Sequence, residues 1–465
     1  DDGLIHVSKD NGSHWENVTP SGMPEWMMIN AIEPDPFQKG GLFVAGTRFK
    51  SGDYTPYLYH TTNYGKTWTL ITSGIDKNHF TRVVRADPKR AGLLYAGTES
   101  GMYISFDNGL SWKSFQLNLP IVPITDLTIK NDNLIAATQG RSFWLIDDLT
   151  PLHQLNAGVT NADFHLFKPM PSYRMEGGPG WRGANTKTAG ANHPGGVMVH
   201  FNLKEVPADS VEIKLSFHEA NGKLIKEFST SAKERMDKLT DLKSGGNRFV
   251  WNMQYPGALR FDGMILWAAA LNGPKAVPGM YKVVLSVGKT KQEHSFEILK
   301  DPRSESGIED FKKQFQFLID IRDKVTEAHQ AILDIRETKK QLNHLKSLWK
   351  DDPEMKSLIQ KASDIDKEIT RIENELYQTK NKSGQDPLNY PIKLTNKLAH
   401  VGSLTNRGDF APTQQAIQVK DELNKLINAE LQKWETIKSV DMESFNKSVK
   451  DKGIDVLKIK KENKT

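Results

Sequence analysis

The stretch that decides the fold is Ser105-Phe106-Asp107-Asn108-Gly109-Leu110-Ser111-Trp112, because its pattern occurs twice more upstream. The earlier copies are Ser8-Lys9-Asp10-Asn11-Gly12-Ser13-His14-Trp15 and Thr61-Thr62-Asn63-Tyr64-Gly65-Lys66-Thr67-Trp68. All three fit [ST]-x-[DN]-x-G-x-x-W, and their third positions are 53 and 44 residues apart. A period of about 40–45 residues is typical of one four-stranded blade of a β-propeller. The repeat therefore predicts propeller blades in residues 1–155.

The chemistry of the repeated pattern is that of a tight turn. An Asp or Asn side chain accepts hydrogen bonds from the backbone of the next residues, and Gly supplies a positive φ without a Cβ clash. The Trp is expected to cover the hairpin and pack between neighbouring blades. Because a turn explains these residue types without a ligand, we interpret the box residues as structural: Ser8, Asp10, Gly12, Trp15, Thr61, Asn63, Gly65, Trp68, Ser105, Asp107, Gly109 and Trp112.

The number of blades is too small for a closed propeller. Strand-like runs precede the boxes, and a degenerate fourth copy over residues 133–148 has Asp147-Asp148 in place of the box. About three and a half blades therefore fit before residue 150, whereas propellers have about four to eight, and open sheet edges aggregate. We expect these residues to be the closing blades, completed by an upstream segment of the same protein that is either contiguous or a separate chain.

The middle of the chain changes character. Residues 156–196 include the Gly-rich run 177–183; we interpret the segment as a linker, with a phosphate or sugar cradle as the alternative. Residues 197–302 show alternating strands and an Asn221-Gly222 hairpin signal, which predict a β-sandwich. The apolar segment 255–267 is expected to cover the propeller–sandwich junction, with a docking loop or ligand edge as the alternative.

From residue 303 onward the apolar residues follow a period of 3.6, which predicts an antiparallel helical domain over 303–465. Asp352-Pro353 indicates the start of a second helix. The many lysines are balanced by acidic residues, so we interpret the charged faces as solvated; the alternative is contact with a membrane surface. The predicted fold is thus a partial propeller, a sandwich and a helical bundle.

Composition excludes several classes of function. The chain has 465 residues and a net charge of +5, and no basic module with interleaved aromatics is present, so nucleic acid is not an expected partner. No apolar run reaches the roughly 20 residues of a transmembrane helix. With 0 cysteines, disulfides, thiol catalysis and cysteine-ligated metals are excluded. The histidines lack metal-ligand spacing, and we expect neither a metal nor a cofactor.

The three boxes resemble those of the BNR/Asp-box family, which includes sialidases, sortilin-type propellers and bacterial "glycosyl hydrolase-like" proteins. The resemblance is greatest to bacterial sortilin-like proteins, and extends to Arg248-Phe249-Val250-Trp251 and Pro278-Gly279-Met280-Tyr281, which look like the Ig-like domains that follow such propellers. It implies a cell-envelope protein, periplasmic, outer-membrane-associated or extracellular, in which the propeller binds a protein, peptide or glycan. An envelope protein complex is a further expectation.

The family name also raises an enzymatic alternative, a sialidase-like glycoside hydrolase with an axial site completed by the missing blades. Sialidases use a Tyr nucleophile and an arginine cluster that holds the substrate carboxylate. The arginine candidates are Arg48, Arg82, Arg85 and Arg141, but no Tyr–Glu pair can be placed opposite them and no catalytic residue is assigned. We therefore expect a binding or scaffold protein, with Arg141 as the candidate binding residue; its alternative role is a hydrogen bond that closes a blade.

Overall fold

The computed structural model describes residues 2–175 and 190–453. The chain is multidomain and divides into two compact units. The first contains Asp1–Met170, His200–Glu205 and Ser244–Asn247, and the second contains Pro171–Val199, Val206–Lys243 and Arg248–Thr465. The Gly-rich run 177–183, which we expected to be loop, lies outside the described residues.

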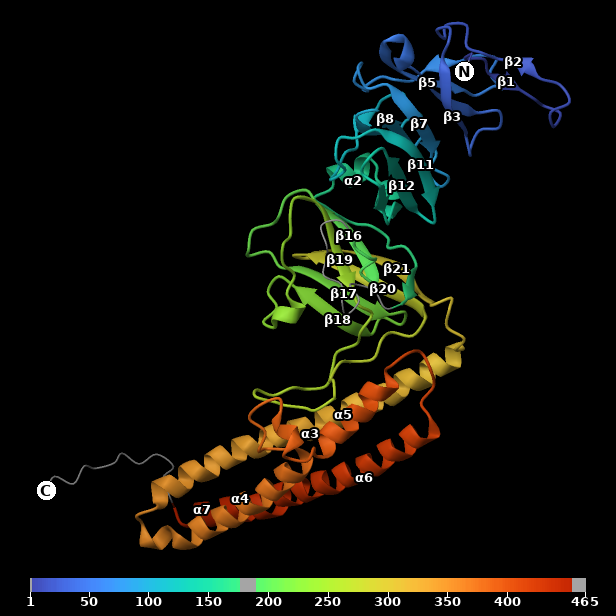
Figure 1. Ribbon diagram of the computed structural model, residues 1–465. Helices are drawn as coiled ribbons and strands as arrows, with labels where there is room; N and C mark the ends of the chain where they lie inside the picture. The colour runs from blue at the N-terminus through green and yellow to red at the C-terminus, as the bar shows by residue number, and fades with distance from the viewer. Residues whose placement is uncertain (1, 176–189, 454–465) are drawn as a thin grey trace. The chain divides into compact units, whose positions relative to one another are not determined.

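The first unit consists mainly of small antiparallel sheets in which successive strands are neighbours (Figure 1). Two sheets have four strands and one has three, after a two-stranded sheet near the N-terminus. A four-stranded antiparallel meander is the shape of a propeller blade, so this part fits a partial propeller. In chain order the strands are β1 (His6–Val7) and β2 (Glu16–Asn17); β3 (Met28–Pro34), β4 (Leu42–Arg48), β5 (Asp53–Thr61) and β6 (Thr69–Leu70); β7 (Thr81–Ala86), β8 (Leu94–Thr98), β9 (Gly101–Ser105) and β10 (Lys113–Ser114); and β11 (Ile124–Lys130), β12 (Asn133–Thr138) and β13 (Phe143–Ile146).

Apolar side chains between successive sheets hold the first unit together. Strands β8 and β9 are buried along their whole length, as expected of strands covered on both faces. One core cluster joins the sheet of β7–β10 to the sheet of β11–β13 and includes Tyr95, Ile124 and Leu134. The first strands of the three sheets, β3, β7 and β11, contact one another in succession.

The segment 156–196, which we expected to be a linker, contains regular structure. Helix α1 (Thr150–Gln154) precedes it, and α2 (Ala157–Asn161), β14 (Phe164–Leu166) and β15 (Ser172–Arg174) lie within it. Strand β14 pairs with β16 (Val197–Leu203), and β15 lies parallel to β21 (Thr290–Lys300). Short strands with mixed polarity give little periodicity, which is why the sequence pattern did not reveal them.

Two further sheets follow. One has the order β14-β16-β19, and the other has the order β15-β21-β20-β17-β18, with β17 (Ile213–Glu219), β18 (Leu224–Ser229), β19 (Gly245–Trp251) and β20 (Gly279–Val287). Trp251 of β19 stacks on Phe217 of β17 at 4.5 Å between ring centroids, so aromatic residues of the two sheets meet. The predicted Asn221-Gly222 turn joins β17 to β18, and Gly222 has a φ of 91°.

The helical part contains the long helix α3 (Ile308–Trp349), with α4 (Lys356–Leu376) and α6 (Gln414–Thr436) packed along it (Figure 1). Shorter helices are α5 (Leu394–Thr405) and α7 (Glu443–Asp451), with a π-helical segment over Ile437–Met442. Asp352 accepts a hydrogen bond from the backbone of Glu354, as expected for the start of the second helix. Among the described helices, none is both long enough and apolar enough to span a membrane. The 3-10 turns are η1 (Phe49–Ser51), η2 (Arg235–Asp237), η3 (Pro353–Met355) and η4 (Asp386–Leu388).

The apolar segment 255–267 packs on the helices, which differs from the expected propeller–sandwich junction. Phe261 contacts His329 and Tyr377 edge-on, with ring centroids 5.3 Å and 5.1 Å away. The backbone of Trp267 exchanges two hydrogen bonds with the Asn396 side chain, at 2.8 and 2.9 Å. The segment is therefore an intramolecular docking loop, and its apolar composition reflects its place in the helical core.

Candidate functional site

The three boxes form the same hydrogen-bonded turn. In the third copy, Ser105 donates to Asp107 at 2.8 Å and accepts from the Gly109 backbone at 2.9 Å. Asp107 in turn accepts from the backbone and hydroxyl of Ser111. The other two copies repeat the first bonds with Ser8–Asp10 and Thr61–Asn63. These polar groups are thus bonded inside the turn, and Asp107, although burial works to raise its pKa, has a pKa lowered overall by the Ser111 and Ser105 hydrogen bonds.

The box tryptophans connect neighbouring sheets. Trp68 donates its indole N–H to the oxygen of Val18 at 2.7 Å, and Trp112 donates to the oxygen of Ile71 at 2.7 Å. Trp15, in the first copy, instead bonds the oxygen of Gly12 in its own turn and is 63% exposed. The second and third tryptophans therefore carry a repeated contact from one blade-like sheet to the preceding one.

The four candidate arginines do not form a cluster around one site. Arg48 pairs with Asp53 at 3.2 Å, and Arg82 pairs with Glu99 at 2.6 Å. Arg85 instead contacts two other carboxylates, and Arg141 hydrogen-bonds the main chain of its own hairpin. A guanidinium already bound to a protein carboxylate is poorly placed to hold a substrate carboxylate as well. A sialidase-like arginine cluster is therefore not assembled by the described residues.

Arg85 links the first strands of three successive sheets. Its Nε donates to the oxygen of Leu127 on β11 at 2.7 Å, and its Nη2 donates to Asp126 Oδ1 at 2.7 Å. Its Nη1 lies 3.5 Å from Oε2 of Glu33 on β3. The Glu33 Oε1 accepts a hydrogen bond from the backbone of Ala86 at 3.2 Å. We call Glu33, Arg85 and Asp126 the inner-strand cluster.

The two carboxylates of the inner-strand cluster lie in different environments. Burial raises the pKa of Glu33 above its usual value, against the hydrogen bond from Ala86 and the charge of Arg85. The charge of Asp126 acts in the same direction as burial. The Asp126 side chain is 61% exposed, compared with 21% for Glu33. The cluster therefore presents one solvated carboxylate, one shielded carboxylate and a guanidinium held between them.

An aromatic patch lies at the hairpin between β4 and β5. Phe49 stacks on Phe80 with ring centroids 5.1 Å apart, and Tyr54 approaches Phe80 at 6.0 Å. The Arg82 guanidinium lies 5.3 Å from the Phe80 ring centroid. Tyr54 is 53% exposed, so part of this patch is open to solvent. Aromatic and guanidinium groups side by side can bind both apolar faces and hydrogen-bonding groups.

Arg141 lies in the hairpin between β12 and β13. Its guanidinium is exposed and bonds the main-chain oxygen of Gly140 at 3.0 Å. Its own oxygen accepts the indole N–H of Trp144 at 2.9 Å. The hairpin thus holds the Arg141 backbone firmly while the charged end of the side chain remains accessible.

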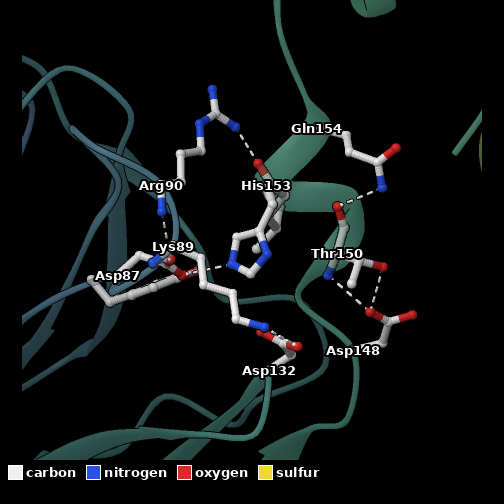
Figure 2. Close-up of polar contacts among 10 residues, drawn as sticks. Asp87, Lys89, Arg90, Asp132, Asp148, Thr150, His153 and Gln154 are labelled. Atoms are coloured by element: carbon white, nitrogen blue, oxygen red, sulfur yellow. Dashed lines mark hydrogen bonds and ion pairs between the residues drawn. The ribbon is translucent and has the colours of Figure 1, made fainter. Parts of the chain in front are cut away.

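A second polar cluster fixes helix α1 to the sheets (Figure 2). His153 of α1 lies 2.9 Å from Asp87, whose side chain is fully buried. Burial alone would raise the pKa of Asp87, but the hydrogen bond from His153 and the backbone bonds of Lys89 and Arg90 lower it overall. Lys89 also pairs with Asp132 at 2.6 Å. Figure 2 shows these side chains pointing toward one another, which indicates that they hold helix α1 against the sheets.

The described residues contain no group of three or more His, Asp or Glu side chains that could hold a metal ion. Four histidines of the first unit, His14, His60, His153 and His200, instead each make a single carboxylate contact. His200 lies 3.2 Å from Asp148, and His60 lies 3.9 Å from Asp35. Pairs of this kind orient an imidazole but supply too few ligands for a metal centre.

Comparison with known proteins leaves the chain without an assigned family. No model of a known family matches it, and no curated protein matches its sequence. Among solved structures, it is similar to the GH74 xyloglucanase from Xanthomonas campestris, with 12% identity, a TM-score of 0.24, and coverage of 63% of this chain and 43% of that one. An ancestral GH74 enzyme gives 14% identity, a TM-score of 0.21, and coverage of 60% and 37%. This chain thus spans less than half the length of either enzyme, and similarity at this level assigns no function.

Sequence reasoning identified Arg85 only as one of four arginines and missed its partners Glu33 and Asp126. These residues lie on three different sheets, 52 and 41 positions from Arg85. No local motif links them. The one available signal was the spacing of the repeated box, which places Glu33, Arg85 and Asp126 each on the first strand of a sheet.

Proposed function

We propose that this chain belongs to an extracytoplasmic binding or scaffold protein whose Asp-box propeller holds a protein, peptide or glycan. In this proposal residues 1–155 are the closing blades, 197–302 an Ig-like sandwich and 303–465 a helical domain, with 156–196 connecting them. We further propose that the protein is located in a bacterial cell envelope and that its partners are the upstream propeller segment and an envelope complex. The box residues act as structural turns, and no metal or cofactor takes part.

The inner-strand cluster carries this proposal. Arg85 is held by three contacts from two neighbouring strands, so its position is fixed before any ligand arrives. Preorganised polar groups bind hydroxyl and amide groups at little entropic cost. Its charge is compensated by Glu33 and Asp126, which suits a neutral ligand better than an anion. The partly exposed patch around Tyr54 offers apolar contact of the kind that a sugar ring or an aromatic side chain needs.

A glycoside hydrolase is the alternative, and one observation favours it. Glu33 and Asp126 flank Arg85, and burial raises the pKa of Glu33. Two carboxylates whose surroundings separate their pKa values can serve as general acid and general base in glycoside hydrolysis. Glu33 would be the acid and Asp126 the base in that case. The sialidase-like form of this alternative is disfavoured because the candidate arginines bind separate partners.

The two functions are separated by testing binding and turnover on the full-length protein. Glycan and peptide arrays would identify ligands, and release of reducing sugar from each bound glycan would measure turnover. Saturable binding without turnover supports the binding protein. Turnover that is lost in both Glu33→Gln and Asp126→Asn, with binding retained, would replace it by the hydrolase. Binding unaffected by Arg85→Ala would remove the inner-strand cluster from the proposal, and Arg141→Ala tests the second candidate in the same assay.

A further inference from the structure

Strands β2, β6 and β10 are each the last, outermost strand of a sheet. The residue that directly follows each of them occupies an equivalent position in the three sheets. Val18, Ile71 and Phe115 each donate their backbone N–H to a residue of the adjacent strand at 2.8 Å, Val18 to Ile5, Ile71 to Leu58 and Phe115 to Met102. The spacings between them are 53 and 44 residues, the same as between the boxes. Val18, Ile71 and Phe115 are therefore equivalent positions.

At the first two of these positions, the box of the following sheet is bound. Trp68 donates its indole N–H to the oxygen of Val18, and Trp112 donates to the oxygen of Ile71. The box glycines lie against the same residues, because a Cβ on Gly65 would come 2.6 Å from Val18 and one on Gly109 would come 2.6 Å from Ile71. The residue after each outer strand is thus the contact position for the glycine and tryptophan of the next box.

Phe115 is the third such contact position, but the sheet that follows it, β11-β12-β13, carries no box. After β13 the chain runs through Asp147 and Asp148 into α1, and within the described residues this sheet has three strands, where its two predecessors have four. Trp144 does not substitute, because its indole N–H bonds the oxygen of Arg141 in its own hairpin. Among residues 2–175 and 190–453, no indole therefore makes at Phe115 the hydrogen bond that the repeat supplies at Val18 and Ile71.

A hollow lies at this position. It opens to solvent, and its lining is mainly apolar: Met102, Phe115, Leu134, Ala136, Trp144 and Ile146. The neighbouring strand β13 has apolar residues on both faces, and Phe143 and Leu145 are 76% and 59% exposed. The equivalent strand β9 is buried throughout and has β10 on its outer edge. β13 thus has the composition of a covered strand at an uncovered edge.

We infer that this hollow and the outer edge of β13 bind a tryptophan-bearing box strand from outside the described residues, which completes the sheet of β11, β12 and β13. The strand adds to β13 as β10 adds to β9, and its indole enters the hollow and donates its N–H to the oxygen of Phe115. An indole matches this lining because it combines a large apolar body with a single hydrogen-bond donor. The inference rests on the propeller architecture of the proposed function and is independent of what the propeller binds.

The chain has 0 cysteines, so a single introduced thiol allows a clean test. The exposed Asn118, at the mouth of the hollow, is changed to Cys and joined by a disulfide to a synthetic peptide of residues 105–116 that carries a terminal cysteine. Tethering gives an effective peptide concentration of about 1 mM, enough to detect weak strand addition. Matched controls are the same peptide with Trp112→Ala, and the original peptide tethered to a Ser51→Cys variant.

The readout is hydrogen exchange of the amides of residues 143–146, together with the indole N–H resonance of the labelled peptide. We expect exchange to slow by about tenfold with the tryptophan peptide at Asn118→Cys and to stay unchanged in both controls. Unchanged exchange with the tryptophan peptide, or equal protection by the alanine peptide, would overturn the inference. Neither result depends on glycan or peptide binding, so a failure here is distinct from a failure of the proposed ligand function.

Discussion

Trp112 donates its indole N–H to the main-chain oxygen of Ile71 at 2.7 Å, across the boundary between two sheets. The bond satisfies a buried donor, since Trp112 is only 4% exposed. Trp68 makes the equivalent bond to Val18. The repeated motif therefore sets both the turn within a sheet and the spacing to the preceding sheet.

Removing this tryptophan should destabilise the first unit. Trp112→Ala is expected to cost about 3–5 kcal/mol in the free energy of unfolding, because it deletes a large buried side chain and its inter-sheet bond. Trp15→Ala is the matched control at the same motif position, since Trp15 is 63% exposed. Urea denaturation followed by hydrogen exchange in β7–β10 measures both. Equal effects of the two changes would contradict the inter-sheet role.

The hydrogen bond between Asp87 and His153 predicts a loss of stability in acid. The pKa of Asp87 is lowered on folding, so its stabilising contribution is present above the unfolded pKa of about 3.9 and is lost as the pH falls through the lower folded pKa. Asp87→Asn should lower the free energy of unfolding near neutral pH by about 1–3 kcal/mol, and should flatten its decline between about pH 5 and pH 2.5.

The measurement is the urea midpoint of the first unit across that pH range. His153→Gln provides a second variant that leaves Asp87 titratable while removing its imidazole partner. A wild-type midpoint that is no more sensitive to acid than that of Asp87→Asn would show that Asp87 contributes nothing to the acid response.

Arg174 should be important for the second unit because it is buried where β15 meets the helical part. It bonds Asp409 and the oxygen of Ala276, and lies 5.0 Å from the Phe311 ring centroid. Burial lowers the pKa of Arg174 to about 10, so it remains charged at neutral pH. Arg174→Ala leaves Asp409 without this partner and should cost about 3–5 kcal/mol. Arg303→Ala, an exposed arginine, is the control for thermal unfolding, and similar shifts in Tm for both variants would refute this role.

His329 predicts a milder pH effect in the helical core. It is fully buried, its Nδ1 lies 2.6 Å from the oxygen of Leu259, and burial lowers its pKa. Protonation is therefore easier in the unfolded chain, so stability should decrease as the pH falls below the unfolded pKa of about 6.5. His329→Gln, which can still donate to Leu259, should reduce this decrease between about pH 7.5 and pH 5. The Tm of α3 unfolding by circular dichroism provides the check, and an identical pH profile in the variant would disprove it.

The parts of the fold that the sequence predicted correctly are those with strong local chemistry. The box turns depend on side chains within four residues of one another, as in Ser105 to Ser111 by way of Asp107, and such contacts can be read directly from spacing. The α3 and α4 helices have buried faces that repeat every three to four residues. The start at Asp352 follows from a capping side chain before a proline.

What the sequence did not reveal depends on contacts between distant segments. The 255–267 loop has an apolar composition that indicates burial, but nothing in it specifies that Phe261 should pack on His329 instead of on the propeller. The inner-strand cluster combines Arg85 with residues from two other sheets. Strand β15 has three residues and is held by its pairing with β21, far along the chain.

The central claim is that the inner-strand cluster holds a ligand, and equilibrium binding to the full-length protein tests it most directly. With a ligand selected on the arrays, Arg85→Ala is expected to weaken binding by about tenfold or more, because loss of a charge-assisted hydrogen bond costs about 1.5–3 kcal/mol. Arg303→Ala, in the other unit, should leave the Kd unchanged. A Kd that is the same for wild type and Arg85→Ala, in a folded variant, would contradict the claim.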